Sequence, residues 1–183
     1  MGYLLYRLLY FHIIKLNMKL IATIAIFGLF VVNAVCDCPN GYMRHDDSCY
    51  KLYASTKASW AEAFMYCQVF GSDLAIIETA REQNFVEGFL RREFKSGMSD
   101  GVWIGGTDSL VEGEWQWVKT GVSINQQEFT HWWPGEPNSS GNLGEDCMDL
   151  LHHENYNWND ERCDRQANFL CEKQAATGQQ IIG

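Results

Sequence analysis

The stretch GEPNSSGNLGEDCMDLLHHENYNWND, from Gly135 to Asp160, decides the interpretation of this chain. Carboxylate and amide side chains stand near both of its ends, in Glu136-Pro137-Asn138 and Trp158-Asn159-Asp160, and Glu145 lies between them. Hard cations such as Ca²⁺ are bound by about six to eight oxygens from Asp, Glu, Asn and backbone carbonyls. Asn and Glu side chains also offer the hydrogen-bond donors and acceptors that a pair of sugar hydroxyls requires. The stretch therefore predicts a calcium-dependent carbohydrate-binding site.

The composition narrows the classes of protein to which the chain belongs. Its 183 residues predict one domain with appendages, and an aromatic content of 14%, with seven Trp, predicts a dense core or an aromatic binding surface. Beyond residue 36 there are 11 basic and 23 acidic residues, a net charge of −12. Nucleic-acid binding requires a basic surface, so the charge argues against that function. The charge fits cation binding, but an ordinary acidic surface that maintains solubility gives the same balance.

The N-terminus has the pattern of a targeting segment. A lysine follows Met18, and a run of 16 mostly apolar residues, 20–35, leads to small residues at which a signal peptidase cuts. Residues 1–36 are therefore predicted to be a signal peptide that starts at Met1 or Met18 and is cleaved after Ala34 or Cys36. A retained signal anchor is the alternative, but the run is at the short limit for crossing a bilayer. We expect a secreted, extracellular protein whose mature form does not insert into a membrane.

The cysteines agree with an oxidising compartment. Loss of Cys36 with the signal peptide leaves six, an even number. The absence of a Cys-x-x-Cys pair argues against zinc-knuckle and thioredoxin-like proteins. Six cysteines allow fifteen pairings, and their spacing alone does not choose among them.

Hydrophobic periodicity and turn residues predict a mixed α and β chain. Thr79-Ala80-Arg81-Glu82 has the form of a capping box and opens one helix, and an earlier helix is predicted over 57–70. From 121 to 142 no period survives, and loops of this length are usually functional. The tail, 174–183, is polar and is expected to be flexible. Further elements are a hairpin at 37–53 and strands at 74–77, 102–105, 114–118, 147–151 and 169–172.

The order of two helices, a strand-rich half and a long loop resembles that of the C-type lectin domain. Three motifs carry the resemblance, in this order: Trp103-Ile104-Gly105-Gly106, Glu136-Pro137-Asn138 and Trp158-Asn159-Asp160. A lone Glu-Pro-Asn is a weak signal, whereas all three motifs with family-like cysteine spacing are highly specific. The resemblance covers residues 37–173 and implies an α+β fold with two helices, small antiparallel sheets and a long calcium-binding loop. It also implies three disulfides: Cys38–Cys49, Cys67–Cys171 and Cys147–Cys163.

The resemblance implies one Ca²⁺ bound by five side chains: Glu136, Asn138, Glu145, Asn159 and Asp160. The same residues are expected to contact two adjacent sugar hydroxyls that also coordinate the ion, with Asn138 and Asn159 donating and the glutamates accepting. In this family the Glu-Pro-Asn order accompanies mannose-, glucose-, N-acetylglucosamine- and fucose-type sugars. Glycans of the mannose type are therefore the predicted partners, and Pro137 is expected to follow a cis peptide bond.

A neighbouring, auxiliary calcium site is implied by four acids: Asp108, Glu112, Glu145 and Asp146. Ser139 departs from the family pattern, which commonly has an acid there, and the stretch 136–145 is one residue longer than in the mannose-binding relatives. Asn138-Ser139-Ser140 is also a glycosylation sequon. A glycan on Asn138 would block the cation, and we expect rapid folding of the proline-containing loop to keep that side chain unmodified.

Other aromatic and histidine residues have simpler explanations. Strand alternation places three tryptophans in the core: Trp103, Trp115 and Trp117. Of Trp132 and Trp133, one is expected to pack under the loop and the other to be available for stacking on a sugar. The adjacent His152 and His153 point to opposite sides of a strand end, which favours a solvated loop over a zinc site.

Three classes of function compete. The leading prediction is a secreted, calcium-dependent lectin that binds mannose-type glycans, in a role such as recognition of microbial surfaces. The second is a structural or mineral-associated protein with the same fold, in which calcium serves stability or adsorption and no sugar binds. An enzyme is not expected, because no activated nucleophile and no acid/base pair is recognisable.

Overall fold

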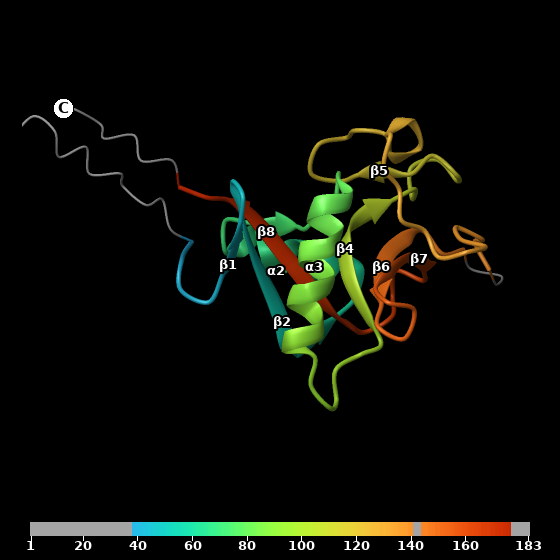
Figure 1. Ribbon diagram of the computed structural model, residues 1–183. Helices are drawn as coiled ribbons and strands as arrows, with labels where there is room; N and C mark the ends of the chain where they lie inside the picture. The colour runs from blue at the N-terminus through green and yellow to red at the C-terminus, as the bar shows by residue number, and fades with distance from the viewer. Residues whose placement is uncertain (1–37, 141–143, 177–183) are drawn as a thin grey trace, which may run out of the picture. The chain divides into compact units, whose positions relative to one another are not determined.

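The computed structural model describes residues 38–140 and 144–176 (Figure 1). Its helical elements are α2 (Trp60–Val69), α3 (Ala80–Glu93) and the 3-10 turn η1 (Ile124–Gln126). Its strands are β1 (Met43–His45), β2 (Ser48–Ala58), β3 (Asp73–Leu74), β4 (Gly101–Thr107), β5 (Gln116–Trp117), β6 (Cys147–Leu151), β7 (Asn157–Glu161) and β8 (Ala167–Gln174). The fold is therefore α+β, as the sequence predicts.

The strands form one twisted sheet in which distant parts of the chain are neighbours. Its order is β1-β2-β8-β4-β6-β7, with β3 added to β8 and β5 added to β4. The pairs are antiparallel except for β4 and β8, which run parallel. At one end of this order β6 and β7 form a hairpin, and the third motif, Trp158-Asn159-Asp160, lies on its second strand (Figure 1).

The two helices pack on opposite faces of the sheet, and alternation along the strands divides the core between them. On β8, Leu170 belongs to the cluster that contains α3, whereas Phe169 and Cys171 belong to the cluster that contains α2. On β4, Ile104 lies on the α3 side and Trp103 on the α2 side. This period of two is the pleat of a strand that is buried on both faces.

The predicted tryptophan core is confirmed. Trp103 and Trp117 are fully buried, and Trp115 is 2% exposed. Trp117 makes an edge-to-face contact with Trp158 of the third motif, with ring centroids 5.5 Å apart. The aromatic core therefore continues directly beneath the strand that carries Asn159 and Asp160.

Helix α2 begins three residues later than the sequence predicts. Lys57 and Ala58 belong to β2, because Ala58 still pairs with Ala167 of β8. Ser59 caps the helix: its hydroxyl accepts the Glu62 N–H at 3.3 Å, and the Glu62 carboxylate accepts the Ser59 N–H at 2.8 Å. This reciprocal capping box was not among the predicted helix starts.

Loss of this cap gives a measurable change in stability. Ser59→Ala is expected to lower the free energy of unfolding by about 1 kcal/mol, because the N–H groups of the first turn lose their acceptor. Urea unfolding followed by Trp fluorescence measures the change. The exposed Ser96→Ala is the matched control, and an equal midpoint for both variants would contradict a capping role for Ser59.

The second predicted capping box is half present. Thr79 caps α3 by accepting the Glu82 N–H at 3.2 Å, as predicted. The Glu82 carboxylate, however, accepts the N–H of Glu78 rather than that of Thr79. The helix start is correctly predicted, but Glu82 accepts a hydrogen bond from Glu78, the residue before the cap, and not from Thr79, the cap residue.

The three disulfides implied by the resemblance are present, and they hold the domain at three places. Cys38–Cys49 closes the N-terminal hairpin of β1 and β2, and Cys67–Cys171 joins α2 to β8. Cys147–Cys163 joins the start of β6 to the residues that follow β7. The last bridge closes the base of the hairpin that carries Trp158-Asn159-Asp160.

The predicted boundaries of the domain differ from the observed ones at the C-terminal end. Strand β8 includes Gln174, the first residue of the predicted tail, and Ala175 donates its N–H to the Asp47 carbonyl at 2.7 Å. The predicted signal peptide, residues 1–36, lies outside the described residues, as does the rest of the tail from 177 onward. In the part of the chain that the structure describes, no helix has the length and apolar character needed to cross a membrane.

Candidate functional site

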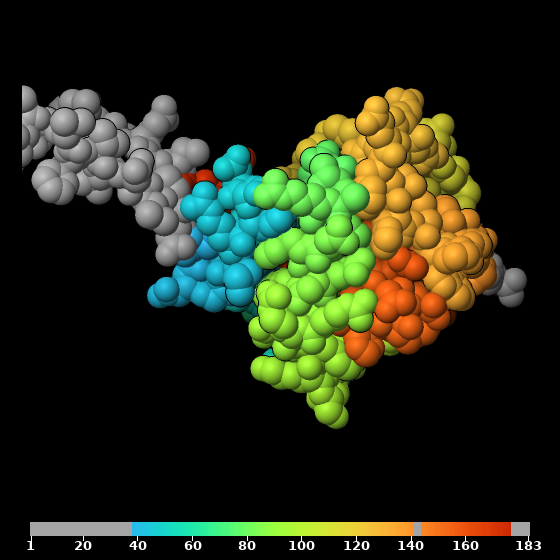
Figure 2. Space-filling model, viewed as in Figure 1, coloured from blue at the N-terminus to red at the C-terminus, as the bar shows by residue number. Residues whose placement is uncertain are grey.

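Backbone hydrogen bonds hold the long loop against β7. Trp133 donates its N–H to the Trp158 carbonyl at 2.8 Å, and Trp158 donates its N–H to the His131 carbonyl at 2.9 Å. The Trp132 side chain packs on Trp115 and Trp158, so it is the tryptophan that lies beneath the loop. In the space-filling view the loop (light orange) and the β6–β7 segment (dark orange) form one continuous surface beside α3 (Figure 2). The two predicted motifs are thus brought side by side.

Asp160 fixes the Glu-Pro-Asn loop to β7. Its Oδ2 atom accepts two successive backbone N–H groups, from Asn138 at 2.8 Å and from Ser139 at 2.5 Å. Asp160 is 2% exposed, and its Oδ1 atom has no hydrogen-bond partner among the described residues. The Glu136–Pro137 peptide bond is cis, as predicted.

Glu136 faces the same carboxylate. Burial, followed by the neighbouring acids Asp160 and Glu145, raises the pKa of Glu136 to about 7. Its Oε2 atom is buried and, within the described part of the chain, has no hydrogen-bond partner. Two buried carboxylate oxygens therefore lie in one small region, where the neighbouring negative charges disfavour ionisation of Glu136 and a bound cation would favour it.

Glu145 and Asn138 complete the rim of this region. Glu145 accepts the Ser140 N–H at 2.8 Å and is close enough to Glu136 to raise its pKa. The Asn138 side chain is exposed, while its backbone is held by Asp160. Four of the five residues predicted as calcium ligands therefore lie together: Glu136, Asn138, Glu145 and Asp160. Residues 141–143, between Ser140 and Gly144, are outside the described part of the chain.

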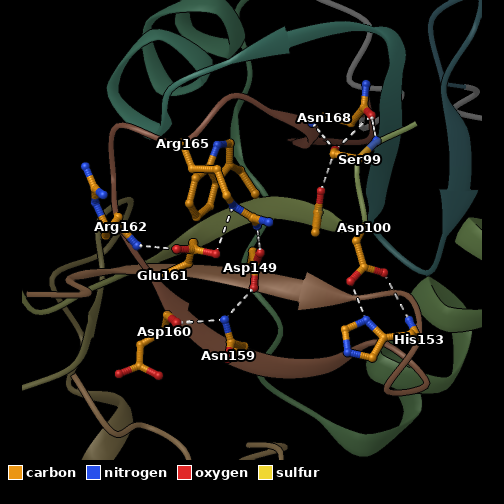
Figure 3. A network of polar contacts seen from close by, with 12 residues as sticks. Ser99, Asp100, Asp149, His153, Asn159, Asp160, Glu161, Arg162, Arg165 and Asn168 are labelled. Atoms are coloured by element: carbon orange, nitrogen blue, oxygen red, sulfur yellow. Dashed lines mark hydrogen bonds and ion pairs between the residues drawn. The ribbon is translucent and has the colours of Figure 1, made fainter. Parts of the chain in front are cut away.

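Asn159 lies next to Asp160, and its amide points in an unexpected direction. Its NH₂ group donates to the Asp160 carbonyl at 2.7 Å and to Asp149 Oδ1 at 3.2 Å (Figure 3). Both of these oxygens accept hydrogen bonds, so the amide nitrogen of Asn159, and not its oxygen, must face them. The sequence predicts that Asn159 donates to a sugar; here both of its donors are used within the protein.

The acids of the predicted auxiliary site also gather. Asp108 is 3% exposed, its Oδ2 accepts the Gly113 N–H at 2.8 Å, and its Oδ1 has no partner within the described residues. Burial raises the pKa of Asp108, and the nearby Glu112 and Asp146 raise it further. The backbone joins two of the segments, because Asp108 donates its N–H to the Asp146 carbonyl at 3.3 Å.

The donor set fits a hard cation better than a transition metal. Three buried carboxylate oxygens, on Glu136, Asp160 and Asp108, have no hydrogen-bond partner in the described part of the chain, and such atoms require an ion or water partner. Among the described residues, no group of three or more His, Cys, Asp or Glu side chains is arranged to hold a metal. A cation at the candidate site would therefore be bound by carboxylate and amide oxygens together, since two of the five predicted ligands are asparagines.

The histidine pair does not form a zinc site. His152 stacks on Phe94 with ring centroids 3.6 Å apart, and His153 faces Asp100 (Figure 3). The two rings have different neighbours, and they lie in the turn between β6 and β7, as the solvated-loop prediction requires.

Two residues near Asn159 were not among the predicted site residues. Asp149 is fully buried on β6, and Arg165 contacts it from the segment between β7 and β8. The sequence contains one signal for Asp149: an acid within the apolar run 147–151, which requires a partner when it is buried. Sequence spacing gives no indication that this partner is Arg165.

Comparison with known proteins identifies the fold. The family model described as "Lectin C-type domain" matches residues 56–173. Perlucin of Haliotis laevigata is 36% identical over 138 residues, which are 75% of this chain and 83% of perlucin. The cow C-type carbohydrate-recognition domain of CD23, solved in the presence of GlcNAc2Man3 oligosaccharide, is 27% identical with a TM-score of 0.65, covering 77% of this chain and 98% of that one. A calcium-independent type II antifreeze protein is 28% identical with a TM-score of 0.64, covering 76% and 96%. The match over residues 56–173, together with this fold and these disulfides, shows that the chain belongs to the C-type lectin domain family.

Proposed function

We propose that this protein is a secreted, calcium-dependent lectin that recognises mannose-type sugars through a pair of adjacent hydroxyls, in a role such as binding microbial glycans. The observation that carries the proposal is a pair of buried carboxylate oxygens beside the Glu-Pro-Asn loop, Glu136 Oε2 and Asp160 Oδ1, which have no hydrogen-bond partner within residues 38–140 and 144–176. A hard cation stabilises such oxygens, and Ca²⁺ accepts the mixed carboxylate and amide ligands present here.

Family membership supplies the broader function. C-type lectin domains bind glycans and are not enzymes, so the chain is a carbohydrate-binding lectin with no catalytic site. The cation, the sugar class and secretion go beyond family membership. The antifreeze relative is described as calcium-independent, so the fold alone does not establish the cation.

Each side chain has a proposed role at the site. Bound calcium would supply an electrophilic centre at which two sugar hydroxyls are held. The carboxylates of Glu136 and Glu145 accept hydrogen bonds from those hydroxyls, and the exposed Asn138 amide donates one. Asn159 is assigned a different role from the predicted one: because its NH₂ group bonds within the protein, its oxygen is the atom directed toward the cation. Asp160 supplies the unpaired Oδ1 and keeps the loop in place through Oδ2.

Chromatography on mannose-agarose tests the proposal. The protein should be retained when calcium is present, and it should elute when a chelator or free mannose is added. Binding at one site is expected to be weak, with a dissociation constant on the order of millimolar, about −4 kcal/mol. Retention that is unchanged by chelator, or no retention on a dense mannose matrix, would contradict the proposal.

Exchange of one carboxylate and one amide is expected to change the sugar preference. Glu136→Gln with Asn138→Asp keeps the net charge of the site but reverses the order of donor and acceptor along the loop. Mannose affinity should fall about tenfold or more, because each mismatched hydrogen bond costs about 1–3 kcal/mol, and galactose should bind relatively better. Competition of mannose and galactose for a glycan-coated surface measures the change. Wild-type mannose affinity in the double variant would show that these two residues do not select the sugar.

The acidic surface supports a second candidate, a structural or mineral-associated protein. A net charge of −12 beyond residue 36 would favour adsorption to calcium-containing crystals without any sugar. Adsorption to carbonate crystals that persists in Asn138→Asp and is not displaced by mannan would favour this function. Retention on mannose-agarose that requires the intact Asn138 would favour the lectin.

A further inference from the structure

We propose that Asp149 and Arg165 are positioning residues that hold the Asn159 amide in one orientation, and so set the affinity of the neighbouring site for its cation. This inference rests on the function proposed above. It concerns two residues that do not themselves face the Glu-Pro-Asn loop and that act through a third.

The sheet register places these groups on one face of three neighbouring strands. Asp149 on β6 is paired with Trp103 on β4 and with Asn159 on β7. Directly opposed residues of antiparallel strands project to the same face, so the three side chains form a row across the sheet. The row ends at Asn159, the residue before Asp160, and it starts at Trp103, the buried tryptophan of the first motif.

Arg165 forms an ion pair with the second carboxylate oxygen of Asp149. Its guanidinium contacts Asp149 Oδ2, its Nε lies 3.1 Å from Glu161 Oε2, and it stacks over the Trp103 ring at 5.2 Å from the centroid (Figure 3). Asp149 Oδ2 is therefore committed to the cation of Arg165, and only Oδ1 remains to accept a hydrogen from Asn159. The geometry thus presents Asp149 Oδ1 to the Asn159 amide as a hydrogen-bond acceptor.

The backbone of β4 is adapted to the pair. A Cβ atom added at Gly101 would overlap Asp149 Oδ2 and the Arg165 guanidinium. The φ angle of Gly101 is not in the left-handed region, so glycine is not required here by the backbone conformation. It is required because a side chain would leave no room for the ion pair. The ion pair thus occupies the space that a side chain at position 101 of β4 would fill.

The consequence is a fixed direction for the Asn159 oxygen. The amide is planar, and its NH₂ faces Asp149 Oδ1 and the Asp160 carbonyl, so its oxygen must point to the other side. In Figure 3 the Asp160 carboxylate also points away from Asn159 and Asp149. Without an acceptor at position 149 the amide is able to rotate, and a cation site would have to select one rotamer from several.

A purely structural role gives a poor explanation for the pair. Asp149 is fully buried beside Arg165, and replacement of buried ion pairs by apolar residues of similar volume is often neutral or stabilising. Outer partners of metal ligands, by contrast, typically change metal affinity about 10–100-fold when they are removed. The two roles therefore predict different outcomes for the same substitution.

The test replaces both members of the pair, so that no single charge stays buried. In Asp149→Leu with Arg165→Met, calcium affinity measured by calorimetry should fall about 10–100-fold, while urea unfolding without calcium should give wild-type or higher stability. NMR of the calcium-free protein should show that the Asn159 side-chain amide signals move toward those of an exposed amide. Asp149→Asn with Arg165→Met keeps a carbonyl acceptor and should recover most of the affinity.

The exposed pair Arg162 and Asp164, whose charged atoms are 2.7 Å apart, gives the matched control. Arg162→Met with Asp164→Leu should leave calcium affinity and the Asn159 signals unchanged. Wild-type affinity in the Asp149/Arg165 variant, or a loss of stability that parallels the loss of affinity, would overturn the inference. Failure of the wild-type protein to bind calcium would instead refute the proposed function, and the Asn159 signals would still report whether Asp149 orients that amide.

Discussion

Replacement of Cys67 and Cys171 by Ala is expected to lower the free energy of unfolding by about 4.7 kcal/mol, more than the removal of either other disulfide. The two cysteines are 104 residues apart in sequence, and their bridge joins α2 to β8 across the sheet. A bridge that closes so long a loop strongly reduces the conformational entropy of the unfolded chain. Domains of this kind are stable by only about 5–15 kcal/mol, so the variant should unfold at much lower urea concentration.

The comparison with the other bridges makes this prediction specific. Cys147–Cys163 and Cys38–Cys49 close loops of 16 and 11 residues, and the same relation gives about 3 and 2.8 kcal/mol for them. Urea unfolding under non-reducing conditions measures all three double-Ala variants. Because every variant loses two sulfur atoms, the difference of about 1.7 kcal/mol between the Cys67/Cys171 variant and the Cys147/Cys163 variant reflects loop length. Equal losses would show that native-state packing of the cystines, and not loop closure, dominates.

Local chemistry in the sequence predicts those elements whose pattern is not altered by tertiary pairing. Thr79 and Glu82 mark the start of α3 correctly, and three tryptophans are buried as alternation predicts. The start of α2 is different, because β2 continues through Ala58 to pair with β8. The local signal that marks the true start is the capping box of Ser59 and Glu62, which helix periodicity alone does not reveal. The disulfide pairing comes from the resemblance, since cysteine spacing alone allows fifteen arrangements.

Strand β7 shows why the sequence pattern alone does not predict part of the site. Its inward-facing residues are Trp158 and Asp160, one aromatic and one acid, so the usual alternation of apolar and polar residues is lost. The acid is buried because it accepts two N–H groups from the Glu-Pro-Asn loop. Such a contact connects residues 21 and 22 positions apart and depends on the fold. The same holds for Asp149, whose partner Arg165 comes from another segment.

Calcium is expected to stabilise the wild-type protein by about 2.7 kcal/mol when its concentration is a hundredfold above the dissociation constant. For an extracellular module with a constant on the order of 10⁻⁴ M, this corresponds to roughly 10 mM calcium. In Asp160→Asn the increment should fall below about 0.5 kcal/mol, because loss of one carboxylate from the site raises the dissociation constant about a hundredfold or more. Urea unfolding with calcium and with chelator measures both increments.

The substitution removes a charge but keeps an oxygen at the position of Asp160 Oδ2, which accepts the N–H groups of Asn138 and Ser139. The stability of Asp160→Asn without calcium should therefore stay closer to that of the wild type than its response to calcium does. Asp164→Asn, an exposed acid paired with Arg162, is the control and should keep the full increment. A wild-type protein that is unaffected by calcium would remove the cation from the proposed function. A wild-type increment in Asp160→Asn would instead place the cation away from the unpaired oxygens of Glu136 and Asp160, because a charge lost beside the ion must weaken its binding.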